Sequence, residues 1–161
     1  MNISVICPLY NAKKYIINLD KSIRMQKNVD IESIYYILTE SEDKSKSILN
    51  DIGAKYEVIK KSDFSHSLTR EKQAMKSSGD IIVFISQDVI IEDDLWLHNL
   101  TKDIIDGKCE AAFSRQICKY NGIEQYTRSK NYPDKSRIVS KKDISKLGLM
   151  TFFFSDASSA V

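Results

Sequence analysis

The feature that most constrains this fold is a series of short apolar runs, separated from one another by segments with helical spacing. The strongest run, IIVFI, is rich in β-branched residues and is bounded by polar residues on both sides. Runs of this kind predict strands at Ile3–Cys7, Ile34–Leu38, Tyr56–Ile59, Ile81–Ile85 and Ala111–Ser114. Proline has no N–H to donate to a sheet, so Pro8 is expected to end the first strand.

Helical spacing fills the gaps between the runs. Ile16, Leu19 and Ile23 share one face of a helix that is expected to begin with Asn11 as its N-cap. Further helices are predicted over Asp43–Ile52, Ser65–Ser78 and Asp93–Ile105. Strands that alternate with helices of this length indicate βαβ crossovers. The sequence therefore predicts an α/β fold built on a mainly parallel sheet. No element is predicted for the last residues, SSAV, which end at Val161.

Composition narrows the function classes. The chain has 161 residues, of which 42% are hydrophobic, which is enough for one domain with a packed core. A formal net charge of +2 gives no reason to expect a nucleic-acid partner. No apolar run is long enough to span a bilayer, and the first residues lack the pattern of a cleaved leader. Three cysteines without a CxxC pair are typical of a reducing compartment, so a cytoplasmic location is expected.

Polar residues follow three of the predicted strands, at the points where those strands end. They are Pro8–Asn11, Thr39–Asp43 and Gln87–Asp88. The carboxyl ends of parallel strands meet at one edge of a sheet, where open α/β folds bind ligands. For Asp88 two interpretations stay open, namely a helix cap or loop carboxylate and a ligand-binding carboxylate. Neither GxGxxG nor GxxxxGK[ST] occurs, so two common phosphate-binding loops are absent from the sequence.

Several stretches together resemble family 2 glycosyltransferases. They are ISVICPLYNAKKYI, TESEDKS, FSHSLTRE, GDIIVFISQDV, SRQ, NYP and FFFSDASSA, in the family's order. The similarity is greatest to bacterial rhamnosyltransferases that build capsular and surface polysaccharides. The resemblance implies a GT-A fold, with residues 1–117 as the nucleotide-sugar part and 118–161 as the start of the acceptor part. It also implies a fold that is incomplete at its C-terminal end.

Residues for the nucleoside half of the donor are carried over by position in the family's motifs. The resemblance implies that Pro8, Tyr10 and Asn11 line the nucleoside pocket, with Tyr10 against the base. The family usually has an aspartate after the second strand that recognises the base. This chain has no acid at that place, and Thr39 or Glu40 is expected to substitute for it.

The phosphate half of the donor is implied in the same way. Arg70 is expected to approach the diphosphate, and Asp88 matches the last acid of the family's DXD signature, here reduced to SQD with Gln87 in the middle. The resemblance implies that Asp88 holds a divalent cation, Mg²⁺ or Mn²⁺, against the diphosphate. An alternative for Arg70 is an ion pair with acids such as Glu71 on its own helix.

The acceptor side has fewer candidates. Arg115 and Gln116 follow the fifth strand and either orient the acceptor or brace the Asp88 loop. The resemblance places Asp156 in the sugar-binding part of the pocket, and helix N-capping is its alternative. The family's catalytic base comes from a Glu-Asp pair downstream of SDASSA, so it is expected beyond Val161, the last residue of the sequence. Asp156 is the remaining candidate for the base, and the chain alone is expected to transfer little or no sugar.

The segment from Lys119 to Lys146 is basic, with eight Lys/Arg and three Asp/Glu. Either it attracts an anionic membrane surface or a lipid-linked acceptor at the inner membrane face, or it is a solvated surface. Three tyrosines in the segment are candidates for stacking on sugar rings. They are Tyr120, Tyr126 and Tyr132.

The implied reaction is an inverting transfer of a sugar, rhamnose from a dTDP donor, to a saccharide or lipid-linked saccharide acceptor. Two alternatives remain. One is a truncated, non-catalytic nucleotide-binding domain, which the missing downstream acids favour. The other is a nucleotidyltransferase of similar fold, which would be expected to carry a glycine-rich phosphate loop near the N-terminus, where this chain has PLYNAKK.

Overall fold

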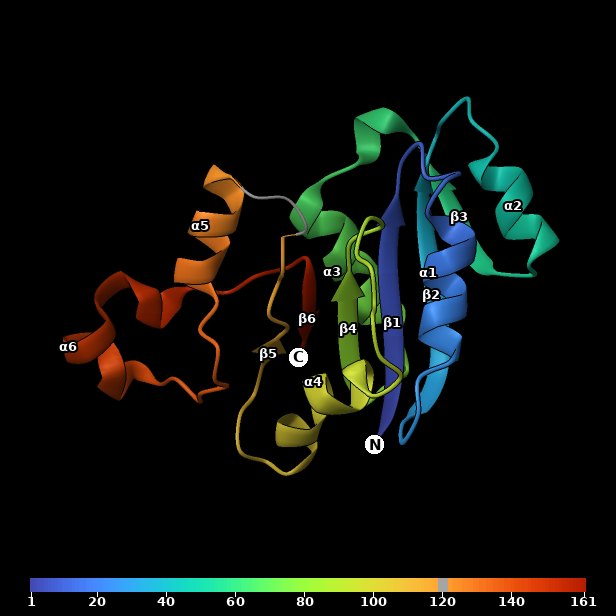
Figure 1. The fold of residues 1–161 in the computed structure, drawn as a ribbon. Coiled ribbons are helices and arrows are strands. Elements are labelled where there is room, and N and C mark those ends of the chain that lie inside the picture. The colour runs from blue at the N-terminus through green and yellow to red at the C-terminus, as the bar shows by residue number, and fades with distance from the viewer. Residues whose placement is uncertain (119–121) are drawn as a thin grey trace.

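A computed structural model describes residues 1–118 and 122–161, and within these residues the strands form one six-stranded sheet (Figure 1). The strand order is β3-β2-β1-β4-β6-β5. The strands are β1 (Asn2–Leu9), β2 (Asp30–Thr39), β3 (Lys55–Ile59), β4 (Ile81–Ile85), β5 (Ala112–Phe113) and β6 (Ser158–Ala160). The first four are parallel neighbours, as the alternating pattern predicts, and this confirms the α/β fold class.

β1 is one of the two middle strands of the sheet and is largely buried. Ile3, Val5, Ile6 and Cys7 are fully buried. The strand also continues through Pro8, so the expectation that Pro8 ends it is wrong. Pro8 lies opposite Ile37 of β2, while the pairing with β4 has ended at Ile6. At Pro8 the strand therefore has a recorded neighbour on one side only, where the loss of an N–H donor is tolerated.

The helices between the parallel strands lie where the apolar spacing predicts them, but α1 and α4 begin clearly later. Asn11 has a φ of +49°, a left-handed conformation, and α1 starts five residues further on. Asn11 is therefore not its N-cap. The helix predicted from Asp93 starts at Trp96, and the Asp93 carboxylate accepts a hydrogen bond from the Leu95 N–H. The helices are α1 (Ile16–Arg24), α2 (Ser45–Asp51), α3 (His66–Lys76) and α4 (Trp96–Ile105).

Residues Ser158–Ala160, where the sequence shows no finished element, form the short strand β6. This strand lies antiparallel between β4 and β5. Its three residues are buried, and the Ser158 hydroxyl donates to the Ser114 hydroxyl at 2.9 Å. Val161 extends the pairing with β4, because it exchanges two backbone hydrogen bonds with Ile82, at 2.9 and 3.0 Å. A strand inside the sheet thus contains two serines and carries no apolar run by which it could be recognised.

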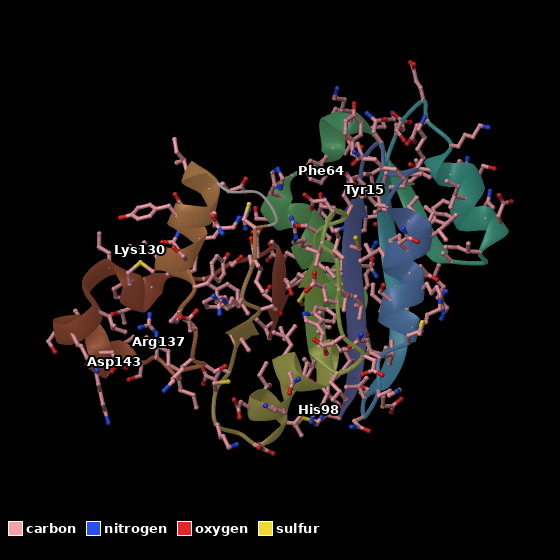
Figure 2. All side chains as sticks on the ribbon, in the orientation of Figure 1. Tyr15, Phe64, His98, Lys130, Arg137 and Asp143 are labelled. Carbon is pink, nitrogen blue, oxygen red and sulfur yellow. The ribbon has the colours of Figure 1, made fainter. Side chains whose placement is uncertain are left out.

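Between β5 and β6 the chain leaves the sheet, and residues 114–157 are called the excursion below. Figure 1 shows it set to one side of the sheet, and Figure 2 shows Lys130, Arg137 and Asp143 on it. Its described helices are α5 (Ile123–Asn131), η2 (Lys141–Asp143), α6 (Ile144–Leu147) and η3 (Gly148–Phe152).

Edge-to-face aromatic contacts attach the excursion to β5. The ring of Phe113 lies 6.0 Å from Tyr132, 5.6 Å from Phe153 and 5.4 Å from Phe154, measured between centroids. Tyr132 is only 6% exposed, so its ring belongs to this cluster rather than to a sugar-stacking surface. Tyr126 is exposed, and Tyr120 lies outside the described residues. None of the helices described here is long and apolar enough to cross a membrane.

Candidate functional site

The loops that leave β1 and β2 are joined at the carboxyl edge of the sheet. The Asp43 carboxylate accepts from the Lys13 N–H at 3.0 Å, and the buried Ser45 hydroxyl accepts from the Ala12 N–H at 2.9 Å. Burial opposes ionisation of Asp43, but hydrogen bonds from Ser45, Lys13 and Ser41 outweigh it and lower the pKa of this carboxyl. Figure 2 shows Tyr15 and Phe64 near this edge and His98 near the opposite one.

The loops that leave β1 and β4 are joined by the side chain of Gln87. Its Oε1 accepts from the Tyr10 N–H at 2.8 Å, and its Nε2 donates to the Tyr10 carbonyl at 3.0 Å. Gln87 and Asp88 form a turn, which the Val89 N–H closes onto the Ser86 carbonyl. The residue expected to face the base and the residue expected to hold the metal therefore sit on two loops that are directly bonded to each other.

Tyr10 presents its ring to solvent at this edge, with 42% of the residue exposed. The Nζ of Lys61 lies 5.4 Å from the ring centroid, a cation–π arrangement. Lys61 belongs to η1 (Lys61–Asp63), the short helix after β3. A planar group that stacks on Tyr10 would thus meet a positive charge brought by a third loop.

The two candidates after β2 lie at the same edge in different environments. Thr39 is buried and pairs in register with Ile59 of β3. The Glu40 N–H donates to the Ile59 carbonyl at 2.9 Å, and its side chain is exposed. Of these two residues, Glu40 offers the accessible polar group.

Arg70 reaches the edge from α3 and is only 12% exposed. One of its terminal nitrogens donates to the His66 carbonyl at 2.8 Å, and the other lies 3.9 Å from the Asp156 carboxylate. Its Nε is buried and has no hydrogen-bond partner among the described residues. The recorded ion pair of Arg70 is thus with Asp156, and none with Glu71 occurs in the described part of the chain.

Asp88 is exposed on its turn. The charges of Arg70 and Asp88 both act on the pKa of the buried Cys7 thiol. Burial raises the pKa of Cys7, the Arg70 guanidinium opposes this, and the Asp88 carboxylate adds to it. Arg70 pairs with Asp156, two residues before Ser158, and Ser158 pairs with Ile85 at the end of β4. Arg70 and Asp88 therefore both lie at the carboxyl end of that strand.

A metal ion held by protein groups alone does not fit this edge. No group of three His, Cys, Asp or Glu side chains that could hold one occurs in residues 1–118 and 122–161. One exposed carboxylate, Asp88, suits a hard cation that takes its other ligands from phosphate oxygens and water. The residues present thus fit a divalent ion that binds together with a diphosphate.

The candidates after β5 contact the excursion. The Arg115 guanidinium lies 2.6 Å from the Asp134 carboxylate, and the Gln116 amide donates to the Ser155 hydroxyl at 2.8 Å. Neither side chain has a recorded hydrogen bond or ion pair to the Asp88 loop in the described structure. Both side chains therefore bond within the excursion, and the two interpretations of them, orienting the acceptor or bracing the Asp88 loop, stay predictions.

Asp156 contacts Arg70 on one side and lines a cavity beside α5 on the other. It is 71% exposed and precedes β6, so it does not cap a helix N-terminus, and that alternative is wrong. Besides contacting Arg70, it lines a cavity of about 310 Å³ together with Arg128, Asn131 and Phe154. A larger cavity of about 370 Å³ lies around Arg24, Glu32 and Lys55 at the opposite, amino edge of β2 and β3, away from all of the candidates.

Sequence reasoning missed Ser45 and Lys61 as parts of this edge, and it gave Asp43 no role in joining the loops. Asp43 and Ser45 lie in a pattern typical of a helix start, and their type alone could have suggested that they bond backbone N–H groups. Lys61 is one of many surface lysines, and only the folded position of η1 brings it over Tyr10. The edge as a whole offers the aromatic face of Tyr10, the guanidinium of Arg70 and the exposed carboxylate of Asp88.

Comparison with known proteins agrees with this arrangement. The family model described as glycosyl transferase family 2 matches residues 4–160. The O-antigen chain rhamnosyltransferase RfbN of Salmonella typhimurium is 31% identical over 164 residues, covering 99% of this chain and 52% of that protein. WbaN of Salmonella anatum, also an O-antigen chain rhamnosyltransferase, is 30% identical over 98% of this chain and 51% of that protein. The chain spans about half the length of the curated relatives it matches.

Solved structures show the same fold. Glucosyl-3-phosphoglycerate synthase from Mycobacterium tuberculosis, in complex with UDP, superposes with a TM-score of 0.60 and 19% identity, covering 99% of this chain and 56% of that one. The same enzyme with Mn²⁺, UDP-glucose and phosphoglyceric acid gives a TM-score of 0.53 and 22% identity over 66% of this chain and 40% of that one. From the family match and the rhamnosyltransferase relatives, we conclude that the chain belongs to glycosyl transferase family 2.

Proposed function

We propose that this chain forms the donor-binding half of an inverting glycosyltransferase that takes a nucleotide sugar, dTDP-rhamnose, as its donor. The observation that carries the proposal is the convergence of Tyr10, Arg70 and Asp88 at one edge of the sheet, from three separate elements. The names of the two curated relatives support rhamnose as the sugar and surface polysaccharide synthesis as the role. In this proposal residues 1–117 hold the donor and 118–161 begin the acceptor side.

Electrostatics supports the reaction class. When a sugar leaves a nucleoside diphosphate, negative charge gathers on the leaving phosphate, and a positive group aimed at it lowers the barrier. Arg70 supplies such a group on a rigid helix, and its buried Nε lacks a partner in the described structure until an acceptor atom arrives. A divalent ion bound through Asp88 would supply further positive charge at the same phosphates. Mn²⁺ accompanies UDP-glucose in the mycobacterial relative of this fold.

Each donor candidate then has a defined task. The Tyr10 ring receives the base, with Pro8 and Asn11 shaping the loop beside it. Glu40 is the exposed polar group placed to recognise the base edge, while buried Thr39 supports the end of β2.

The acceptor side is assigned to the cavity beside Asp156. This carboxylate lies between the Arg70 guanidinium and the cavity under α5, so it borders the donor phosphates and the excursion at once. We assign Asp156 to orienting sugar hydroxyl groups. Arg115 and Gln116 then hold the excursion in place around a saccharide or lipid-linked saccharide acceptor.

The catalytic base is assigned to the family's acid pair beyond Val161 rather than to Asp156. In the described structure the Asp156 carboxylate already faces the Arg70 guanidinium at 3.9 Å, on the donor side of the edge. The proposal therefore keeps donor binding within these residues and places proton removal outside them.

A binding panel tests the proposal. The melting temperature of the protein would be measured with dTDP, UDP, GDP, ADP, their sugar conjugates and the matching nucleoside triphosphates, each with and without MnCl₂. We expect dTDP and dTDP-rhamnose to give the largest stabilisation, and we expect Mn²⁺ to increase it. Stabilisation by nucleoside triphosphates alone would favour a nucleotidyltransferase, and no stabilisation by any nucleotide would overturn the proposal.

A further inference from the structure

The side-chain amide of Gln87 does more at this edge than occupy the middle of the SQD sequence. The Oε1 and the Nε2 both bond the backbone of one residue, Tyr10, at 2.8 and 3.0 Å. An amide used in this way imitates one rung of a sheet ladder. The sequence separation of the two residues is 77, so the contact depends on the assembled sheet.

The hydrogen bonds between Gln87 and Tyr10 lie beyond the last recorded backbone pair of β1 and β4. The recorded backbone pairing of β1 with β4 stops at Ile6 and Phe84, before either strand ends. Beyond it the Ser86 N–H turns away from β1 and donates to the Ala157 carbonyl. Among the described residues, the recorded hydrogen bonds between the two loops at this place are those of the Gln87 amide to Tyr10.

The backbone after Tyr10 makes the need for such a bond clear. Asn11 has a φ of +49°, so the chain reverses direction directly after the bonded residue. Left-handed conformations of non-glycine residues are uncommon and persist where the surroundings hold them. Gln87 fixes the start of this reversal, while Ser45 and Asp43 fix its far side through Ala12 and Lys13.

We propose that Gln87 is a positioning residue that sets the distance between the Tyr10 ring and the Asp88 carboxylate. This inference rests on the proposed function, because it assumes that one nucleoside diphosphate spans both groups. Gln87 precedes Asp88 in the same turn and bonds Tyr10 directly, so a rigid amide joins the base side to the phosphate side. A ligand with both parts then binds to a preformed platform and loses less entropy on binding.

The chemistry selects glutamine over its near relatives. Glutamate has the same length but no N–H, and its second oxygen would face the Tyr10 carbonyl. Asparagine is one methylene shorter and cannot span the same gap without moving a loop. Gln87→Glu and Gln87→Ala are therefore matched variants, since the first keeps the shape and the second removes the side chain.

A first experiment needs no ligand. Amide hydrogen exchange at Tyr10 is measured in the parent, Gln87→Glu and Gln87→Ala. We expect the Tyr10 N–H to be protected in the parent and to exchange about tenfold faster or more in Gln87→Ala, as when a hydrogen bond is lost. Amides in β1 such as Val5 serve as the internal reference and are expected to stay unchanged. Equal exchange of Tyr10 in all three proteins would overturn the inference.

A second experiment separates positioning from direct contact by a double-mutant cycle. The dissociation constant for dTDP with MnCl₂ is measured in the parent, Tyr10→Leu, Gln87→Ala and the double variant. We expect Gln87→Ala to weaken binding about tenfold in the parent background, on the scale of lost hydrogen bonds. In the Tyr10→Leu background it should have little further effect, because the ring that Gln87 positions is absent.

The outcomes distinguish a failure of the role given to Gln87 from a failure of the proposed function. If Gln87→Ala weakens dTDP binding equally with and without the Tyr10 ring, Gln87 contacts the ligand itself and the inference is wrong. If the parent binds neither dTDP nor any other nucleotide while its Tyr10 N–H remains protected, the proposed function is wrong, and the ligand part of the inference is lost with it. Gln87→Leu, which cannot accept a hydrogen bond from the Tyr10 N–H, repeats both measurements should Gln87→Ala fold poorly.

Discussion

The guanidinium of Arg70 and the carboxylate of Asp156 lie 3.9 Å apart, which joins α3 to the segment that enters β6. The arginine side chain is 12% exposed and the aspartate side chain 71% exposed, so one partner is largely buried and the other faces solvent. A diphosphate that binds to Arg70 has to share the guanidinium with Asp156 or displace it. The pair thus places a carboxylate in competition with the expected ligand.

We therefore expect Asp156→Asn to increase the affinity for dTDP. An exposed ion pair contributes up to about 1 kcal/mol, so the gain should be about two- to fivefold. Thymidine has no phosphate, and its affinity should stay the same. Isothermal titration calorimetry with both ligands gives the comparison, and a weaker binding of dTDP by the variant would show that Asp156 helps to hold the donor.

Arg70→Ala should have the opposite effect. Hydrogen bonds to charged groups contribute about 1.5–3 kcal/mol, so dTDP binding should weaken by about ten- to a hundredfold. Thymidine binding should change little. Lys76→Ala is the matched control, because Lys76 lies at the far end of the same helix and pairs with Glu57. Similar losses for thymidine and dTDP would assign a structural role to Arg70.

Asp88→Asn should remove the part of the dTDP affinity that depends on Mn²⁺. The amide keeps the shape of the side chain but loses the charge that attracts a hard cation. The affinity without metal should remain close to that of the parent. Asp51→Asn, an exposed acid at the end of α2, is the control. An unchanged stimulation by Mn²⁺ in Asp88→Asn would move the metal to another group.

Acid should weaken the junction between the β1 and β2 loops. The pKa of Asp43 is lowered in the folded protein, so its contribution is present above the ordinary aspartate pKa of about 4 and is lost as the pH falls through the lower folded value. Denaturant unfolding of the parent and of Asp43→Asn between pH 7 and pH 2.5 measures this. The variant should be less stable at pH 7 and should lose less stability in acid. Two parallel pH curves would contradict the assignment.

Gly79→Ala should destabilise the fold without any change at the candidate site. A Cβ at Gly79 would lie 2.6 Å from both the backbone nitrogen and the hydroxyl of Ser4 in β1. Overpacking of this kind costs about 1–3 kcal/mol. Adding Ser4→Ala should not restore stability, because the backbone nitrogen remains in the way. Urea unfolding of both proteins provides the test.

The strands that alternate with helices could be predicted because each carries its own signal. IIVFI is apolar along its whole length, and its carboxyl end points to the edge where Asp88 lies. β6 could not be predicted in this way, since Ser158 and Ser159 are buried by their neighbours β4 and β5 rather than by their own apolar character.

The candidate site also has one part that the sequence predicts and one that it does not. The sequence places Tyr10 and Asp88 after neighbouring strands, and that is enough to predict a shared edge. The bonds of Gln87 to Tyr10 and of Arg70 to Asp156 join residues distant in the chain and depend on the path of loops. The helix start expected at Asn11 is too early, because a left-handed residue and a helix cap are both typical of asparagine.

The insertion of β6 beside β5 has a consequence for how such enzymes diversify. The excursion starts and finishes on adjacent strands, where Phe113 pairs with Ser159 and Gln116 bonds Ser155. The entropy of closing a loop grows only slowly with its length. Residues between these two anchors can therefore be lengthened, shortened or replaced by the corresponding piece of another enzyme at little cost to the sheet. A chimera built in the laboratory could therefore exchange this segment while β1 to β4 and their connecting helices stay unchanged.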